Sequence, residues 1–152
     1  MKPEPETILV IGMGNPFRGD DAVGLLVADG AAEACPGIRV IRHTADGTGL
    51  LEAWNGYDTV VVADAVVSGS PPGTVHVLDG LSGLERDWFA TSTHAVNLAE
   101  AVELGRALGR LPPRLIVIGI EGNEFRLGEP VSAVVCKAVN DAIARLVEIT
   151  GR

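Results

Sequence analysis

Aromatic residues, cysteines and long hydrophobic runs are all scarce in this chain of 152 residues. Because aromatic residues make up only 4%, the core must be built from Val, Leu, Ile and Ala, as is typical of buried parallel sheets covered by helices. The two cysteines, Cys35 and Cys136, match no metal-ligand spacing, and we predict that both are buried, reduced thiols within helices. No apolar stretch approaches the ~20 residues that cross a bilayer. Neither a disulfide framework nor a membrane-spanning protein is therefore expected.

Positive charge is scarce as well. Twelve Lys and Arg stand against twenty Asp and Glu, giving a net charge of -8, and no basic run could neutralise a series of phosphates. Nucleic acid and anionic membranes are therefore not expected as partners. Residues 1–7 are polar and contain two prolines and two glutamates, unlike the leader of a secreted protein, so we expect a cytoplasmic location.

The composition, with 47% apolar and 21% charged residues, is that of a compact globular protein. No linker, repeat or low-complexity tract divides the chain, so a single domain over residues 1–152 is predicted. Apolar runs predict strands at 8–11, 38–41, 59–66, 74–78 and 115–120. Helical spacing predicts helices at 20–34, 50–54, 94–108 and 131–148, with Ser92 or Thr93 available to cap the third. The alternation predicts an α/β fold, a three-layer α/β/α sandwich with a mostly parallel, twisted sheet.

The glycine-rich loop after the first predicted strand, residues 12–19, does not have the features of a nucleotide-binding loop. Phe17 stands where a dinucleotide motif needs its third glycine. The loop also has the glycine spacing of a phosphate loop, but Asp20 and Asp21 follow it where Lys and Ser or Thr are required. Two carboxylates would repel a phosphate. The loop is better suited to presenting carboxylates to a cation or a peptide.

Three positions carry candidate metal ligands. Asp64 lies at the carboxyl end of the most apolar predicted strand, His94 begins a predicted helix, and Asp20 and Asp21 begin another. Each position also has a purely structural explanation. Asp64 would cap the next turn through Ser68 or backbone amides, His94 would face water, and the paired aspartates would only complement a helix dipole. Together, two oxygens and one nitrogen suit Ni²⁺ or Zn²⁺ with coordination positions left open.

The remaining histidines and serines are not expected to carry chemistry. His43 and His76 lie in strand-like segments without an acidic partner at useful spacing, so both are predicted to be structural. Ser68, Ser70 and Ser92 lack a G-x-S-x-G setting, and a serine nucleophile is not expected.

Three ordered motifs together resemble the maturation endopeptidases of [NiFe] hydrogenases. They are residues 12–24 (GMGNPFRGDDAVG), 62–66 (VADAV) and 92–98 (STHAVNL), with further similarity at 46–51 and 119–122, so the resemblance spans nearly the whole chain. It implies an α/β/α sandwich that removes a short C-terminal extension from the hydrogenase large subunit once nickel has been inserted.

The resemblance also implies a site. The family's three metal-contacting residues match Asp21, Asp64 and His94. The first is often glutamate in the family, which leaves open whether Asp20 shares the role of Asp21. Nickel is expected to arrive with the substrate, with Zn²⁺ or Cd²⁺ as surrogates, and the protein is expected to be a monomer.

The resemblance does not decide whether the metal is catalytic or only recognised, and the label aspartic-type endopeptidase describes residue type more than a paired-aspartate mechanism. Two alternatives to a protease are a nickel-binding chaperone that uses the same ligands to check the precursor and a nucleotide-binding regulator. The regulator needs the phosphate loop that the sequence lacks.

Overall fold

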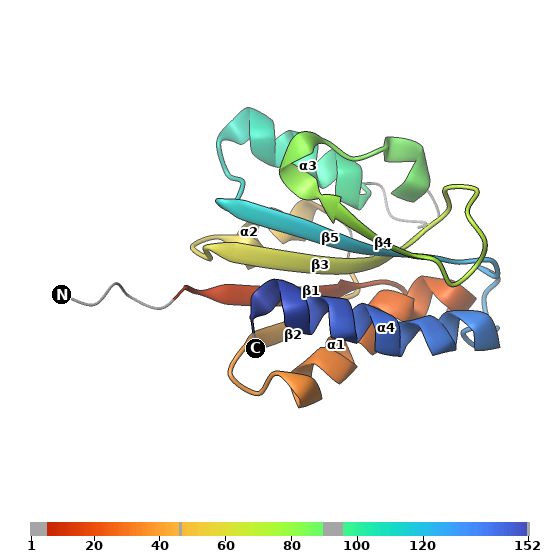
Figure 1. The fold of residues 1–152 in the computed structure, drawn as a ribbon. Coiled ribbons are helices and arrows are strands. Elements are labelled where there is room, and N and C mark those ends of the chain that lie inside the picture. The colour runs from red at the N-terminus through yellow and green to blue at the C-terminus, as the bar shows by residue number, and fades with distance from the viewer. Residues whose placement is uncertain (1–5, 46, 90–95, 152) are drawn as a thin grey trace.

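A five-stranded sheet with helices on both faces forms the core of the molecule (Figure 1). The computed structural model describes residues 6–45, 47–89 and 96–151. The strands are β1 (Ile8–Met13), β2 (Arg39–His43), β3 (Thr59–Val66), β4 (Val75–Asp79) and β5 (Arg114–Glu121). They are arranged in the order β2-β1-β3-β5-β4, and only β4, at one edge, runs antiparallel to its neighbour.

The helices form two layers around this sheet. They are α1 (Val23–Ala34), α2 (Leu50–Trp54), α3 (Leu98–Leu108) and α4 (Ala133–Thr150), with short 3₁₀ turns at η1 (Gly19–Ala22), η2 (Gly47–Gly49), η3 (Gly80–Ser82) and η4 (Arg86–Phe89). One apolar cluster joins one face of the sheet to α1 and α4, and a second joins the opposite face to α2 and α3. The predicted three-layer α/β/α sandwich is therefore confirmed.

Side-chain alternation along the central strand explains why both faces are covered. Val61, Ala63 and Ala65 point into the cluster beneath α1 and α4, while Val60 and Val62 point into the cluster beneath α2 and α3. Every residue of β3 is buried, so this strand needs helices on both sides.

The strand order contains a reversal that places a ligand site. The chain moves from β1 to β2 on one side and then crosses to β3 on the other side of β1. In open α/β sheets, ligands bind in the crevice outside the carboxyl ends of the strands at such a switch point. Here that crevice lies between β1 and β3.

Two glycines allow α1 to approach this crevice. A Cβ on Gly12 would lie 2.3 Å from the carbonyl oxygen of Gly24, and a Cβ on Gly24 would lie 2.3 Å from the carbonyl oxygens of Met13 and Ala63. No side chain fits at either position, so the first turn of α1 lies directly against β1 and β3. The residues that precede α1 are thereby held over the ends of these strands.

Element boundaries differ from the sequence-based expectation at several ends. α1 begins at Val23 after the η1 turn, β2 covers 39–43, and α4 begins at Ala133. The largest difference is in α3, which begins at Leu98 and not at His94. Asn97 caps α3, because its side chain accepts the Glu100 N–H while the Glu100 side chain accepts the Asn97 N–H. The predicted caps Ser92 and Thr93 lie outside the described residues.

The two cysteines differ in exposure. Cys35 is buried next to the end of α1, and Cys136 is exposed on α4, so the prediction of two buried thiols is wrong for Cys136. Cys136 lies on the solvent side of an amphipathic helix whose buried stripe passes through Val135 and Ala138. Both thiols are free. Among the described helices, none is long and apolar enough to cross a membrane.

Candidate functional site

Asp21 and Asp64 meet at the crevice between β1 and β3. Asp21 is in η1, directly after the glycine loop, and Asp64 is the sixth residue of β3, paired in register with Gly119 of β5. Both side chains are buried and line one small pocket. The other described residues of its lining are Met13, Gly14, Phe89, Val96, Asn97 and Leu98.

The electrostatics of the pocket favour a cation or a proton. Burial raises the pKa of Asp64 well above its ordinary value, and the nearby charge of Asp21 raises it further. One hydrogen bond opposes this effect, since the Ala65 N–H donates to Oδ1 of Asp64 at 2.9 Å. A metal ion placed between the two carboxylates would remove their repulsion and displace the proton.

The neighbouring aspartates of η1 have different surroundings. Asp20 is completely buried, and its carboxylate accepts the N–H groups of Asn123, Glu124 and Ser132 at 2.7–2.9 Å, together with the Ser132 hydroxyl. Asp20 therefore holds the loop 122–132 and does not line the pocket. Asp21 accepts the Asn15 N–H through Oδ2 at 3.0 Å and faces Asp64 across the pocket.

The third predicted ligand, His94, lies outside the described residues. The described residues on either side of this gap, Phe89 and Val96, both line the pocket. The described part of α3 begins four residues after His94, at Leu98.

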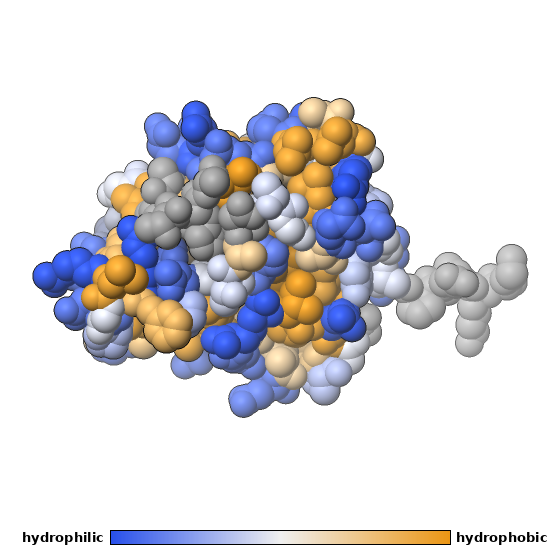
Figure 2. Space-filling model, turned by 180° about the vertical axis from the view of Figure 1, so that it is seen from behind, coloured by the Kyte–Doolittle hydropathy of each residue, from blue (hydrophilic) through white to orange (hydrophobic). Residues whose placement is uncertain are grey.

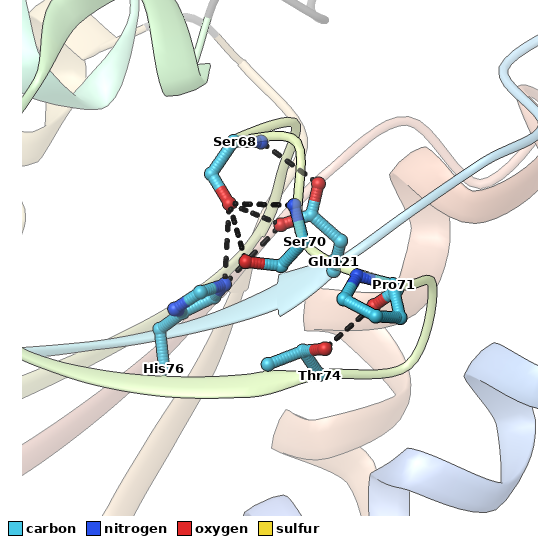
Figure 3. Close-up of polar contacts among 6 residues, drawn as sticks. All are labelled: Ser68, Ser70, Pro71, Thr74, His76 and Glu121. Atoms are coloured by element: carbon cyan, nitrogen blue, oxygen red, sulfur yellow. Dashed lines mark hydrogen bonds and ion pairs between the residues drawn. The ribbon is translucent and has the colours of Figure 1, made fainter.

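A second polar cluster, formed by Ser68, His76 and Glu121, lies at the same edge of the sheet (Figure 3). Glu121 is buried at the end of β5 and accepts the Ser68 N–H at 2.8 Å and the Ser68 hydroxyl at 2.6 Å. His76 Nε2 lies 3.2 Å from the same carboxylate, and its ring packs near Trp88. His76 therefore has an acidic partner in the fold, although none lies at useful spacing in the sequence.

The antiparallel pairing of β4 with β5 explains this contact. It places His76 beside Gly119, two residues from Glu121, although the two partners are far apart in the sequence. Spacing along the chain does not reveal an antiparallel edge strand that follows parallel ones, so this pair could not be predicted.

This cluster does not have the geometry of a serine nucleophile. Ser68 Oγ and Glu121 Oε1 both contact Nε2 of His76, at 3.4 and 3.2 Å, whereas a catalytic triad uses the two ring nitrogens separately. The Ser68 hydroxyl is donated to Glu121. The proposed capping of Asp64 by Ser68 is likewise not found among the hydrogen bonds of the described residues, because Ser68 is held by Glu121.

Comparisons with known proteins match this chain to one family. A family model described as hydrogenase maturation protease matches residues 32–150. A hydrogenase 2 maturation protease of Escherichia coli (strain K12) is 28% identical over 149 residues, covering 93% of this chain and 91% of that protein. The hydrogenase expression/formation protein HupD of Rhizobium leguminosarum bv. viciae is 26% identical over 154 residues, covering 93% of this chain and 74% of that protein.

Solved structures agree with these matches. The [NiFe] hydrogenase maturation protease HycI from Thermococcus kodakarensis KOD1 is 26% identical with a TM-score of 0.71, over 96% of this chain and 93% of that one. The hydrogenase maturating endopeptidase HybD from E. coli superposes with a TM-score of 0.74 at 22% identity, over 94% of this chain and 91% of that one, which shows the shared fold.

Proposed function

Because the chain belongs to the hydrogenase maturation protease family, we propose that it removes the C-terminal extension of a [NiFe] hydrogenase large-subunit precursor after nickel insertion, and that it recognises the nickel held by that precursor. The observation that carries this proposal is the convergence of Asp21 and Asp64 in one buried pocket at the switch point of the sheet. His94 completes the proposed ligand set.

The chemistry of the donor set supports nickel recognition. Two carboxylates and one imidazole offer oxygen and nitrogen ligands, which suit Ni²⁺ and also Zn²⁺ or Cd²⁺ as surrogates. Three ligands from the protease leave coordination positions free for groups of the precursor. Burial and, second, the charge of Asp21 raise the pKa of Asp64, so a divalent cation carried by the precursor would compete with a proton for this carboxylate.

Bond cleavage needs a water molecule activated near the scissile carbonyl. A carboxylate of the pocket can accept a proton from that water and pass it to the leaving amine when one of its oxygens is not bound to the metal. Asp21 keeps its contact with the Asn15 N–H and orients the pocket. The substrate's metal then serves recognition, and the carboxylate serves proton transfer.

Mass spectrometry of the precursor tests the proposal directly. The purified protein, incubated with nickel-loaded precursor, should shorten it by one fixed C-terminal peptide. A matched control is Asp79→Asn, because Asp79 is exposed on β4 and, within the described part of the chain, its carboxylate accepts hydrogen bonds from Leu81 and Ser82 of its own turn. A precursor that is bound but keeps its full mass would contradict the proposal and indicate a nickel-binding chaperone.

A further inference from the structure

The side chain of Asn97 makes one hydrogen bond more than a helix cap requires. Its oxygen accepts the Glu100 N–H at 2.9 Å, and this bond starts α3. Its nitrogen donates to the carbonyl oxygen of Arg86, in η4, at 3.2 Å. Because the donor and the acceptor of an amide are different atoms, only one orientation of this side chain satisfies both partners. Serine caps a helix as well as asparagine does, so the bond to Arg86 is a feature separate from the cap.

The start of α3 is a fixed support for this side chain. Leu98 is completely buried in the apolar cluster beneath α2 and α3. The Gly47 N–H donates to the Val96 carbonyl at 2.9 Å, and a Cβ on Gly47 would lie 2.8 Å from the carbonyl oxygen of Asn97. The backbone of η2 therefore lies directly against residues 96–97. These contacts set the position of Asn97 independently of η4.

η4 forms another wall of the pocket. Phe89, its last residue, is buried and lines the pocket together with Asp64 and Asn97. Because η4 is a single turn of four residues, its own hydrogen bonds do not fix its place in the molecule. The Trp88 carbonyl accepts the Val67 N–H at 2.9 Å, which joins η4 to the end of β3, and the Asn97 bond joins η4 to α3. The position of the Phe89 wall therefore depends on both contacts.

A second contact between η4 and α3 lies at the surface. Arg86 and Glu100 form an ion pair at 3.4 Å, and their side chains are 73% and 35% exposed. Figure 2 views the molecule from the side of α2 and α3 and shows hydrophilic side chains among apolar ones, so charges on this side meet water. Water and salt weaken an exposed ion pair. The bond from the buried Asn97 is therefore expected to hold η4 more firmly than this ion pair does.

We propose that Asn97 is a positioning residue of the cleavage reaction, because its side-chain amide joins η4 to the start of α3 and thereby fixes the Phe89 wall of the pocket that contains Asp64. The inference rests on the proposed function. Cleavage needs the walls of the site held accurately, since a small misplacement of reacting groups lowers the rate of the chemical step. Asn97 acts through η4, so its loss changes that rate and not the affinity for the precursor.

Two substitutions separate the bond to η4 from the helix cap. Asn97→Ser keeps an oxygen that can accept the Glu100 N–H but removes the nitrogen that donates to Arg86, whereas Asn97→Ala removes both. The probe is the nickel-loaded large-subunit precursor of a [NiFe] hydrogenase from the same organism, at a temperature well below the Tm of either variant. We expect both variants to lower kcat about tenfold while KM stays within about twofold of the wild-type value.

Tryptophan fluorescence reports on η4 without any substrate. The chain has two tryptophans, Trp88 in η4 and the buried Trp54, and Trp88→Phe identifies the emission of each. Asn97→Ser should increase the quenching of Trp88 by acrylamide about twofold, because η4 has lost one of the contacts that hold it and opens more often.

Thr150→Val is the matched control, since it also removes one side-chain hydrogen bond. The Thr150 hydroxyl donates to the Leu146 carbonyl at 2.9 Å near the end of α4. The neighbouring Ile149 carbonyl accepts from Arg114, the first residue of β5, so the control lies at the opposite edge of the sheet. It should leave kcat, KM and the quenching of Trp88 unchanged.

The outcomes separate this inference from the proposed function. A kcat of Asn97→Ser equal to that of the wild type would overturn the inference. A raised KM with unchanged kcat would also overturn it, because Asn97 would then bind the precursor itself, and so would an equal loss of kcat in Thr150→Val. If the wild type leaves the loaded precursor intact, the proposed function fails. Stronger quenching of Trp88 in Asn97→Ser would still support the positioning of η4 in that case, and unchanged quenching would overturn it.

Discussion

Asp20 and Asp21 are neighbours in the sequence, yet the fold gives their carboxylates different partners. Asp20 accepts three backbone N–H groups and a hydroxyl from the loop 122–132, whereas Asp21 lies in the pocket with Asp64. A fully buried carboxylate that satisfies four donors has little capacity left for a metal. The geometry therefore favours Asp21 as the ligand and gives Asp20 a supporting role.

Substitution of the two aspartates should separate these roles. Asp21→Asn should stop processing while the Tm stays near that of the wild type. Asp20→Asn should keep a substantial cleavage rate at low temperature but lose about 1–3 kcal/mol of stability, because at least one buried N–H loses its acceptor. Thermal unfolding and mass-spectrometric rates on both variants provide the comparison. The reverse pattern would assign the ligand role to Asp20.

We predict that the ionised carboxylate of Asp64 lowers the free energy of unfolding. Its pKa is raised in the folded chain above the ordinary value of 3.8, so the folded state binds the proton more tightly than the unfolded state. Stability is therefore lost as pH rises from about 3.8 through the raised value. Asp64→Asn should raise the Tm at pH 7 by a few degrees, since 1 kcal/mol corresponds to about 2–4 °C for a chain of this size.

The pH dependence and a control sharpen this prediction. The Tm difference between Asp64→Asn and the wild type should shrink as pH falls toward 3.8, because the Asp64 carboxyl of the folded chain is then protonated and as uncharged as the asparagine. Asp79 has its pKa lowered by hydrogen bonds from the Ser82 hydroxyl and the Leu81 N–H, so Asp79→Asn should lower the Tm at pH 7. A lower Tm for Asp64→Asn at pH 7 would contradict a raised pKa of Asp64 in the folded chain.

Metal binding by the isolated protein should depend on His94 and on pH. We expect weak binding of Ni²⁺ or Zn²⁺ that His94→Ala largely abolishes, measured by calorimetry with His43 and His76 replaced in both proteins to remove background. Binding should weaken as pH falls through about 6, because an imidazolium cannot ligate and because Asp64 takes up its proton at a pH above the ordinary carboxyl range. Equal metal affinity of the proteins with and without His94 would show that His94 is not a ligand.

Among the elements, α3 has the clearest local start signal. Asn97 and Glu100 form a reciprocal capping box, and Asn97 also lines the pocket. Asn97→Ala should cost about 1 kcal/mol of stability, because the Glu100 N–H loses its acceptor. Asn97→Asp keeps that acceptor and should retain most of the stability. Urea unfolding of the two variants measures the difference, and equal midpoints would show that the box contributes nothing.

The elements also show how far the sequence determines this structure. The observed bounds agree with the prediction for the apolar run 59–66 and for the short helix 50–54. A fully buried strand is an unbroken apolar run, and a helix places apolar residues at helical spacing, so both are visible in the sequence. The start of α3 was predicted at His94 because Ser92 or Thr93 could cap a helix there, whereas the reciprocal hydrogen bonds of Asn97 and Glu100 start the helix at Leu98. Local patterns located the elements better than their ends.

The candidate site was predictable only in part. Asp64 was recognised at the carboxyl end of an apolar strand, where ligands bind in parallel sheets, whereas Asp21 was chosen over Asp20 only through the resemblance to the family. The separate role of Asp20 was not predictable, since its donors come from residues 123–132, more than a hundred positions away. The pair of His76 and Glu121 was missed for the same reason, because an antiparallel edge strand creates it.

For the molecule as a whole, the sheet acts as a rigid frame for three groups of residues at one edge. The glycine contacts between α1 and β1 fix η1, the Asp20 hydrogen bonds fix the loop 122–132, and Glu121 fixes the turn that follows β3. The pocket, its carboxylates and the exposed Phe17 are thereby held in one arrangement before any partner arrives. Preorganisation of this kind lets a small difference in the partner decide whether it binds.

Nickel in the precursor is the difference that we expect to decide cleavage. If Asp21, Asp64 and His94 complete the coordination of an ion already held by the precursor, the free energy of that contact is present only in the loaded state. About 1.4 kcal/mol already gives tenfold discrimination between the two forms. The purified protein should therefore cleave the nickel-loaded precursor, leave the nickel-free form intact and not degrade casein. Loss of the C-terminal peptide, followed by mass spectrometry, measures each reaction. Comparable cleavage of both precursor forms would contradict nickel recognition, because specificity would then have to come from contacts that do not involve nickel.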